Sequence, residues 1–162
     1  MPIKGLYPGS FDPVTNGHLD LALRSLDIFD ELVIGVYDTP SKNLIFNTQE
    51  RVALFANALG NAPNVTVTPY SGLTVDHARK INAKAILRGL RAITDFENEF
   101  EMALMNRKLN PDIEVVCLMT SLEHLFLSSS RVKEVASLGG EIKDLVPPNV
   151  AQALIDRLAG KA

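Results

Sequence analysis

Residues 3–29 read IKGLYPGSFDPVTNGHLDLALRSLDIF, and this stretch decides the fold class. Residues 3–7 have the apolar composition of a buried strand, and the leucine-rich run at 19–28 is typical of a helix. Residues 7–18 lie between them and are rich in Pro, Gly, Asn and Asp, which favour turns. A strand, a turn-rich loop and a helix form the first half of a βαβ unit, so the stretch indicates an α/β protein.

The same alternation continues to the end of the chain. Four further segments are predicted to be strands: 31–37, 65–70, 85–89 and 113–119. Helices are predicted from a capping box at 47–50 through 59–60, at 74–81, at 95–109, after Ser128 and after 147–148. We therefore expect a Rossmann-like, doubly wound α/β fold, with a five-stranded parallel sheet covered by helices on both faces.

Ligands of such sheets bind at the carboxyl ends of the strands, near the point where the strand order reverses. If the order is 3-2-1-4-5, the loop after the first strand and the segment 88–91 after the fourth strand are neighbours. The helix predicted at 95–109 carries an apolar set that suits packing on its own sheet or on a neighbouring chain. The set comprises Phe96, Phe100, Ala103, Leu104 and Met105.

Composition limits the function classes. The chain has 162 residues, of which 46% are hydrophobic and 22% charged, so we expect one domain spanning 1–162. A net charge of −3 argues against binding a nucleic acid along its length. No apolar run approaches the roughly 18 to 20 residues of a membrane span, and no secretion signal is evident, so no membrane association and a cytoplasmic location are expected.

The single cysteine, Cys117, lies in the apolar run IEVVCLM and is expected to be part of the core. One cysteine excludes an internal disulfide and a cysteine metal site. The chain also shows no pair of carboxylates and no histidine cluster spaced for metal binding. We therefore predict no metal site built by protein ligands alone.

The opening loop lacks both familiar phosphate-binding patterns, since it has no G-x-x-x-x-G-K-[ST], and Gly9 and Gly17 are too far apart for G-x-G-x-x-G. Gly17, in the first turn of a helix, would still let a phosphate approach the backbone. His18 beside it can donate a hydrogen bond to phosphate oxygens and stabilise charge that develops at phosphorus. The alternative for a single histidine is that it caps a turn or packs beneath the loop.

Two short motifs resemble the signatures of the nucleotidyltransferase superfamily. Thr15-Asn16-Gly17-His18 resembles its (H/T)-x-G-H motif, and the run LSSSRVK at 127–133 resembles its I-S-S-[ST]-x-x-[RK] motif. Within that superfamily the chain resembles the bacterial phosphopantetheine adenylyltransferases over nearly its whole length. That resemblance also rests on 40–42, 49–54, 87–91 and 95–97.

The resemblance implies an enzyme that transfers the adenylyl group of ATP to 4′-phosphopantetheine, forming dephospho-coenzyme A and pyrophosphate. It further implies Mg²⁺ carried mainly by the ATP phosphates, a homohexamer, and feedback inhibition by coenzyme A. The acceptor phosphate is already an anion, so no general base is needed and catalysis reduces to alignment and charge stabilisation.

The resemblance also assigns the site. His18 is implied to be catalytic by meeting the α-phosphate in the transition state. Binding of the acceptor is implied for Ser10, Lys42, Thr74 and Arg88. Binding of ATP is implied for Ser10, Phe11, His18, Gly89, Leu90, Arg91, Glu99, His124, Leu125, Phe126, Leu127, Ser128, Ser129 and Ser130.

Three positions depart from the family pattern. Ser10 stands where threonine is frequent and keeps the hydroxyl. Thr74 stands where an aliphatic residue is usual, so a contact there is secure only through the backbone. His124 replaces a common Trp or Tyr, which alters stacking on adenine.

Other activities remain open beside this one. One is the same attack with another acceptor, as in a nicotinamide mononucleotide adenylyltransferase or a glycerol-phosphate cytidylyltransferase. The other is a nucleotide-binding regulator without catalysis.

Overall fold

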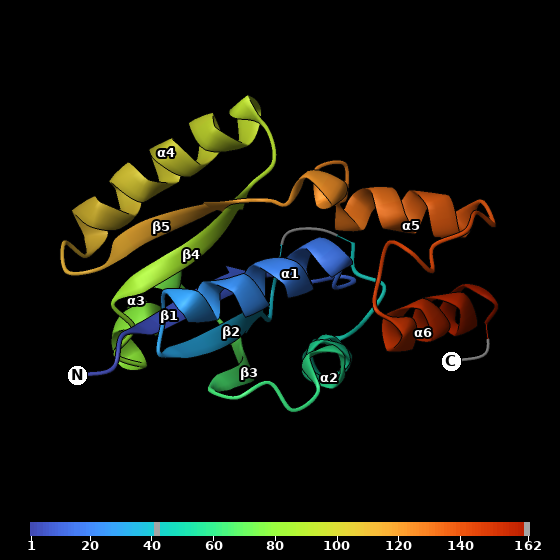
Figure 1. Ribbon diagram of the computed structural model, residues 1–162, viewed down its shortest axis with the longest axis horizontal. Coiled ribbons are helices and arrows are strands. Elements are labelled where there is room, and N and C mark those ends of the chain that lie inside the picture. The colour runs from blue at the N-terminus through green and yellow to red at the C-terminus, as the bar shows by residue number, and fades with distance from the viewer. Residues whose placement is uncertain (41–42, 161–162) are drawn as a thin grey trace.

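The computed structural model describes residues 1–40 and 43–160 of the protein. Strands and helices alternate as the sequence predicts, and their bounds differ from the expected ones by a few residues at most (Figure 1). The strands are β1 Lys4–Gly9, β2 Glu31–Tyr37, β3 Val65–Tyr70, β4 Ala85–Leu90 and β5 Glu114–Met119. The helices are α1 Asn16–Arg24, α2 Thr48–Leu59, α3 Thr74–Lys80, α4 Ile93–Leu109, α5 Ser129–Ser137 and α6 Pro148–Leu158, with 3₁₀ turns at Ser25–Asp27 and Leu122–His124.

The five strands form one parallel sheet, which confirms the predicted fold class, and their order β3-β2-β1-β4-β5 is the one for which neighbouring loops were expected. The order reverses between β1 and β4, so the loops that follow these two strands are neighbours. Side chains alternate across each strand and divide the interior into two apolar clusters. This arrangement accounts for the nearly continuous burial of β1 and β2.

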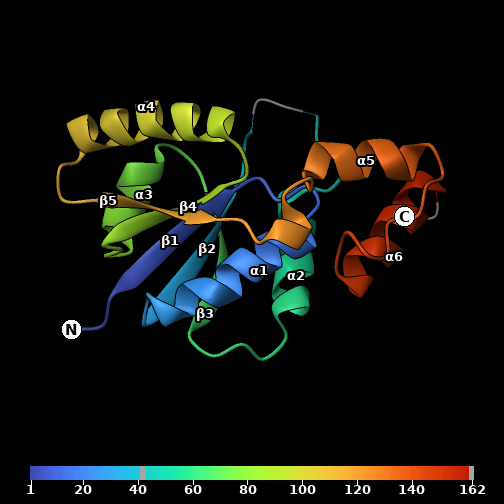
Figure 2. The same ribbon diagram turned by 45° about the horizontal axis from the view of Figure 1, so that its top comes forward.

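The larger cluster lies on the face covered by α1 and α2, where Ile34 and Leu87 of the sheet meet Phe55 of α2. The smaller cluster lies on the opposite face, where Leu6 and Ile86 pack against α3. Figure 2 shows α3 and α4 on one side of the sheet and α1 on the other. Helices α5 and α6 add Val132 and Leu154 to the larger cluster.

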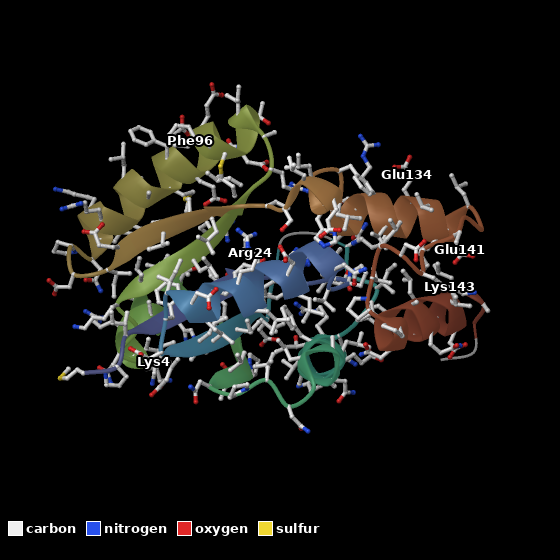
Figure 3. All side chains as sticks on the ribbon, viewed as in Figure 1. Lys4, Arg24, Phe96, Glu134, Glu141 and Lys143 are labelled. Atoms are coloured by element: carbon white, nitrogen blue, oxygen red, sulfur yellow. The ribbon has the colours of Figure 1, made fainter. Side chains whose placement is uncertain are left out.

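The apolar residues of α4 are not part of either cluster, and α4 buries no residue. Phe96, Phe100, Leu104 and Met105 are each more than half exposed. In Figure 3 the Phe96 ring lies on the side of α4 turned away from β5. The sequence left two alternatives for these side chains, packing on their own sheet or on a neighbouring chain. The structure does not show the first one.

The expectation that Cys117 belongs to the core is wrong, because its side chain is exposed. Cys117 lies opposite Arg88 in the register of β5 with β4, on the face of the sheet that α4 covers only loosely. β5 is also the last strand of the sheet, so it has a neighbouring strand on one side only. Within the described residues, no helix combines the length and apolarity that a membrane span requires.

Candidate active site

The first part of the site is the turn from the opening loop into α1. Thr15 is the N-cap, and its Oγ1 accepts a hydrogen bond from the backbone N–H of His18 at 3.3 Å. In return His18 Nδ1 accepts from the backbone N–H of Thr15 at 3.0 Å. Histidine thus completes a capping box at the position where Glu or Gln is usual. Because Nδ1 accepts, the neutral ring carries its proton on Nε2, which makes Nε2 a hydrogen-bond donor.

Aromatic rings hold His18 in place. Phe11 meets the His18 ring edge-on at 5.1 Å and the Phe55 ring at 4.8 Å. The backbone of Phe11 has a φ of 50°, which is uncommon for a residue other than glycine and turns the chain sharply. Its side chain is 4% exposed, so contact between Phe11 and a nucleotide has to come mainly from the backbone.

A buried arginine fixes the backbone just before this turn. Arg51 is fully buried and donates to the carbonyl of Ser10 at 2.7 Å and to that of Tyr37 at 2.9 Å. Burial lowers the pKa of Arg51, and the nearby Asp12 and Asp38 oppose that shift. Arg51 therefore ties the opening loop to the end of β2.

The second part of the site is the end of β4. Arg88 donates from Nε and Nη2 to the two carboxylate oxygens of Glu99 at 2.8 and 2.6 Å, and from Nη1 to the carbonyl of Pro8 at 3.2 Å. Burial disfavours its charge, but the hydrogen bonds and negative charge of Glu99 prevail and raise the pKa of Arg88. Glu99 thus orients a guanidinium that still has N–H donors to offer an anion.

Arg91 links this part to the third. It donates to the carbonyl of Leu127 at 2.7 Å, while its backbone N–H and its Nε both bond to Asp95. Gly89 allows the close approach of β4 to α1, because a Cβ there would lie 3.1 Å from Leu21 Cδ2. The segment 88–91 is therefore held between α1 and the residues that precede α5.

The third part is the start of α5. Ser128 is its N-cap and accepts from the N–H of Arg131 at 3.2 Å. Ser129 Oγ donates to the carbonyl of Pro13 at 2.7 Å, which ties α5 to the opening loop. A helix N-terminus with serines beside it presents N–H donors and a positive dipole end, both of which suit phosphate.

These three parts surround a cavity of about 380 Å³. The predicted ATP-binding residues that line it are Ser10, Phe11, His18, Gly89, Arg91, Glu99, His124, Leu127, Ser128, Ser129 and Ser130. Leu90, Leu125 and Phe126 belong to the same segments, but among the described residues they are not part of the lining. Tyr7, Thr15, Asp95 and Thr120 also line it, although the sequence did not single them out as site residues.

A second cavity of about 240 Å³ adjoins the first, and Pro8, Gly9, Ser10, Arg88 and Glu99 line both. Thr74, the predicted acceptor contact, lines the smaller cavity and shares a 3.0 Å hydrogen bond with the Tyr70 hydroxyl. Ser10 and Arg88, which were predicted to bind the acceptor, therefore lie at the junction. Lys42 lies outside the described residues.

Most residues of the smaller cavity were not predicted from the sequence. Tyr37 and Tyr70 line it, and each ends a strand, which is where ligands of parallel sheets bind. Helix α4 contributes a face whose members are spaced i, i+3, i+4 and i+7. These residues are Glu99, Met102, Ala103 and Asn106.

The carboxylates near the larger cavity are held by arginines, Asp95 by Arg91 and Glu99 by Arg88. Among residues 1–40 and 43–160, no group of three or more His, Cys, Asp or Glu side chains is arranged to hold a metal ion. The donor set suits a divalent cation that arrives with phosphate ligands, since Mg²⁺ commonly keeps waters and few protein ligands.

Comparison with known proteins relates this geometry to a family. A family model described as cytidylyltransferase-like matches residues 6–135. A phosphopantetheine adenylyltransferase from Dictyoglomus thermophilum is 52% identical over 159 residues, covering 98% of this chain and 97% of that relative. One from Thermomicrobium roseum is 51% identical over 160 residues, covering 97% of this chain and 96% of the relative.

The fold has a counterpart among solved structures. A Vibrio parahaemolyticus protein described as a nicotinate-nucleotide adenylyltransferase aligns with a TM-score of 0.73 at 19% identity, covering 100% of this chain and 98% of that one. At that identity the likeness concerns the fold alone. The proteins from Dictyoglomus thermophilum and Thermomicrobium roseum, in contrast, align with this chain over nearly its whole length at 52% and 51% sequence identity. The chain therefore belongs to the phosphopantetheine adenylyltransferase family.

Proposed function

We propose that this protein transfers the adenylyl group of ATP to the phosphate of 4′-phosphopantetheine, giving dephospho-coenzyme A and pyrophosphate. The observation that carries the proposal is the pair of adjoining cavities, which share Ser10 and Arg88. Two substrates bound side by side place an acceptor phosphate next to the α-phosphate of ATP. The names of the relatives support this acceptor.

In the proposed reaction, an oxygen of the acceptor phosphate attacks the α-phosphorus of ATP in line. The bond from that phosphorus to the α,β-bridging oxygen breaks, and pyrophosphate leaves with the electron pair. His18 donates from Nε2 to the α-phosphate as negative charge develops, and its capping contact with Thr15 fixes the ring for this role. No covalent intermediate and no general base are required.

The remaining roles follow the cavity linings. The larger cavity would hold ATP, with its β- and γ-phosphates at Ser128, Ser129 and Ser130 and its adenosine along 88–91 and His124. The smaller cavity would hold the pantetheine arm, with Thr74 and Asn106 as polar contacts. Lys42 and Arg88 would bind the acceptor phosphate. Mg²⁺ would be carried by the ATP phosphates and would neutralise charge there.

We also propose that the protein acts in the cytoplasm as a homohexamer built from one nucleotidyltransferase domain per chain, and that coenzyme A inhibits it at the same site. The exposed apolar side chains of α4 support assembly, because large exposed apolar patches mark interaction surfaces. A coenzyme A molecule shares the phosphopantetheine and adenosine parts of the product, which supports its binding in the same two cavities.

The test is an acceptor screen. Purified protein with Mg²⁺ and ATP should release pyrophosphate when 4′-phosphopantetheine is added, and mass spectrometry should detect dephospho-coenzyme A. Nicotinamide mononucleotide with ATP, and glycerol 3-phosphate with CTP, should release none. Binding of ATP without pyrophosphate release from any acceptor would contradict the proposal and favour a nucleotide-binding regulator.

A further inference from the structure

Lys133 is the last residue of the second signature motif and lines neither cavity. It lies on α5, one turn after the serines at the start of the helix. Its Nζ is 3.2 Å from Asp12 Oδ2 and 3.4 Å from the carbonyl of Asn43. The motif thus contributes a cation that faces the opening loop rather than the proposed nucleotide.

Asp12 is the centre of this contact. Its side chain is 2% exposed, and both of its oxygens are used, because Oδ2 accepts from the N–H of Ile45 at 2.8 Å and Oδ1 from that of Phe46 at 2.9 Å. Buried polar oxygens need hydrogen-bond partners. The Lys133 ammonium and the two backbone amides satisfy the oxygens of the Asp12 carboxylate.

The Asp12–Lys133 pair therefore joins three segments that are distant in the sequence. Asp12 belongs to the loop that carries Ser10 and leads to His18, Asn43 to Phe46 follow β2, and Lys133 belongs to α5. A parallel tie runs one residue further along the loop, where Ser129 Oγ bonds to the carbonyl of Pro13. Together these contacts set where the N-terminus of α5 lies relative to the turn that holds His18.

We infer that Asp12 and Lys133 are a positioning pair for adenylyl transfer. This inference rests on the proposed function. His18 is proposed to donate a hydrogen bond to the α-phosphate, and the serines at the start of α5 are proposed to bind the β- and γ-phosphates. The pair fixes the position of His18 relative to these serines. In-line attack depends on that register, since a misplacement of about 1 Å can lower the rate about 100-fold. A contribution to stability does not by itself explain why these two residues form an ion pair. Apolar residues of similar size at the same positions are often at least as stabilising as a buried ion pair.

The test is a set of steady-state measurements on Lys133 variants at a temperature well below their melting points. Lys133→Met keeps the aliphatic stem and removes the charge, so kcat should fall about 10- to 100-fold while the KM for ATP changes little. Lys133→Arg keeps the charge and should recover most of that loss. Lys143→Met is the matched control, because Lys143 is an exposed lysine outside the site, and its kcat should equal that of the wild type.

A double-mutant cycle tests the pair as a unit. Once Asp12→Asn has removed the carboxylate charge, adding Lys133→Met should cost little further kcat, because contacting partners are not additive. If Lys133→Met melts below the assay temperature, Lys133→Gln replaces it as the milder uncharged variant, with the same expected fall in kcat.

The outcomes separate this inference from the proposed function. A lower melting temperature with kcat within about two-fold of the wild type would overturn the positioning role, since it would leave only a structural one. Equal kcat for the Met and Arg variants, both far below the wild type, would also overturn it. A wild-type protein that makes no dephospho-coenzyme A would overturn the proposed function itself, and the positioning role with it.

Discussion

Helices α2 and α4 both pack alongside the sheet, yet they are packed very differently. Helix α2 buries Phe55 completely and joins a cluster that includes residues of α1, α5 and α6. Helix α4 is longer but buries no residue. In β5 beside it, exposed residues such as Cys117 stand next to partly buried ones, and none is fully buried. The closely packed half of the molecule therefore lies around β1, β2 and the buried start of β4, and the open half comprises the end of β4, β5 and α4.

The proposed chemistry is divided in the same way. His18 lies in the closely packed half, where Phe11 and the capping contact with Thr15 hold its ring. Arg88 and Glu99 lie in the open half and hold mainly each other. His18 is thus held by several contacts of the closely packed half, whereas Arg88 and Glu99, on the side proposed for the acceptor, are held mainly by one another.

Stability should show the contrast most strongly. Phe55→Ala removes a fully buried ring and should lower the free energy of unfolding by about 3–5 kcal/mol. Phe100→Ala removes a ring that is 53% exposed and should cost less than about 1 kcal/mol in the dissociated chain. Urea unfolding measures both. Equal losses at a concentration where the chain is monomeric would contradict the comparison.

Catalysis should fail most clearly in the closely packed half. His18→Ala removes the proposed transition-state donor and should lower kcat by at least about 100-fold, with ATP affinity nearly unchanged. His18→Gln is the sharper variant, because glutamine at this position of a capping box can still accept from Thr15. It should lose the same activity with less loss of stability. Turnover near the wild-type value in either variant would remove His18 from the mechanism.

In the open half, changes should affect binding of the acceptor rather than the chemical step. Arg88→Ala should raise the KM for phosphopantetheine by about 10- to 100-fold, the size expected for hydrogen bonds to a charged group. The KM for ATP should change much less. Arg107→Ala on α4 is the control, since the pair that Arg107 forms with Glu114 is highly exposed and contributes little. An Arg88 effect confined to ATP would contradict the assignment.

The smallest effect should come from His77 on α3. Its ring stacks on Tyr70 at 4.6 Å, and burial, followed by the charge of Lys80, lowers its pKa. Between that lowered pKa and the ordinary value of about 6.5, the unfolded chain binds more protons than the native one, so acidification through this range favours unfolding. Between pH 7.5 and 5.5, His77→Gln should lose less unfolding free energy than the wild type. An equal loss in urea titrations would contradict this sign.

Much of the fold followed from local patterns. The capping box at Asn47 begins α2 as expected, because Asn47 and Glu50 exchange side-chain and backbone hydrogen bonds within four residues. The alternation of strands and helices predicted a parallel sheet, whereas the strand order could be stated only as a condition, because doubly wound sheets occur in more than one order. The burial of individual side chains could not be predicted, because it depends on neighbours that are distant in the sequence. Cys117 has the surroundings of a core residue in sequence, yet β5 is an edge strand and leaves it exposed.

The candidate site was predictable where residues adjoin the end of a strand or the start of a helix. His18, Arg88 and Ser129 all lie there, and they line the larger cavity. Their catalytic and binding roles stay predictions. The smaller cavity was largely missed because its α4 face mixes Met102 with the polar Glu99 and Asn106, so hydropathy does not single it out. Side-chain direction was also beyond reach, as in Leu90, which is absent from the lining.

The most direct test of the account is a crystal structure of the protein with dephospho-coenzyme A bound. We expect the adenylyl phosphate within about 3 Å of the His18 imidazole, the adenosine in the larger cavity and the pantetheine arm in the smaller one. A pantetheine arm outside the smaller cavity, or a phosphate beyond hydrogen-bond reach of His18, would contradict it.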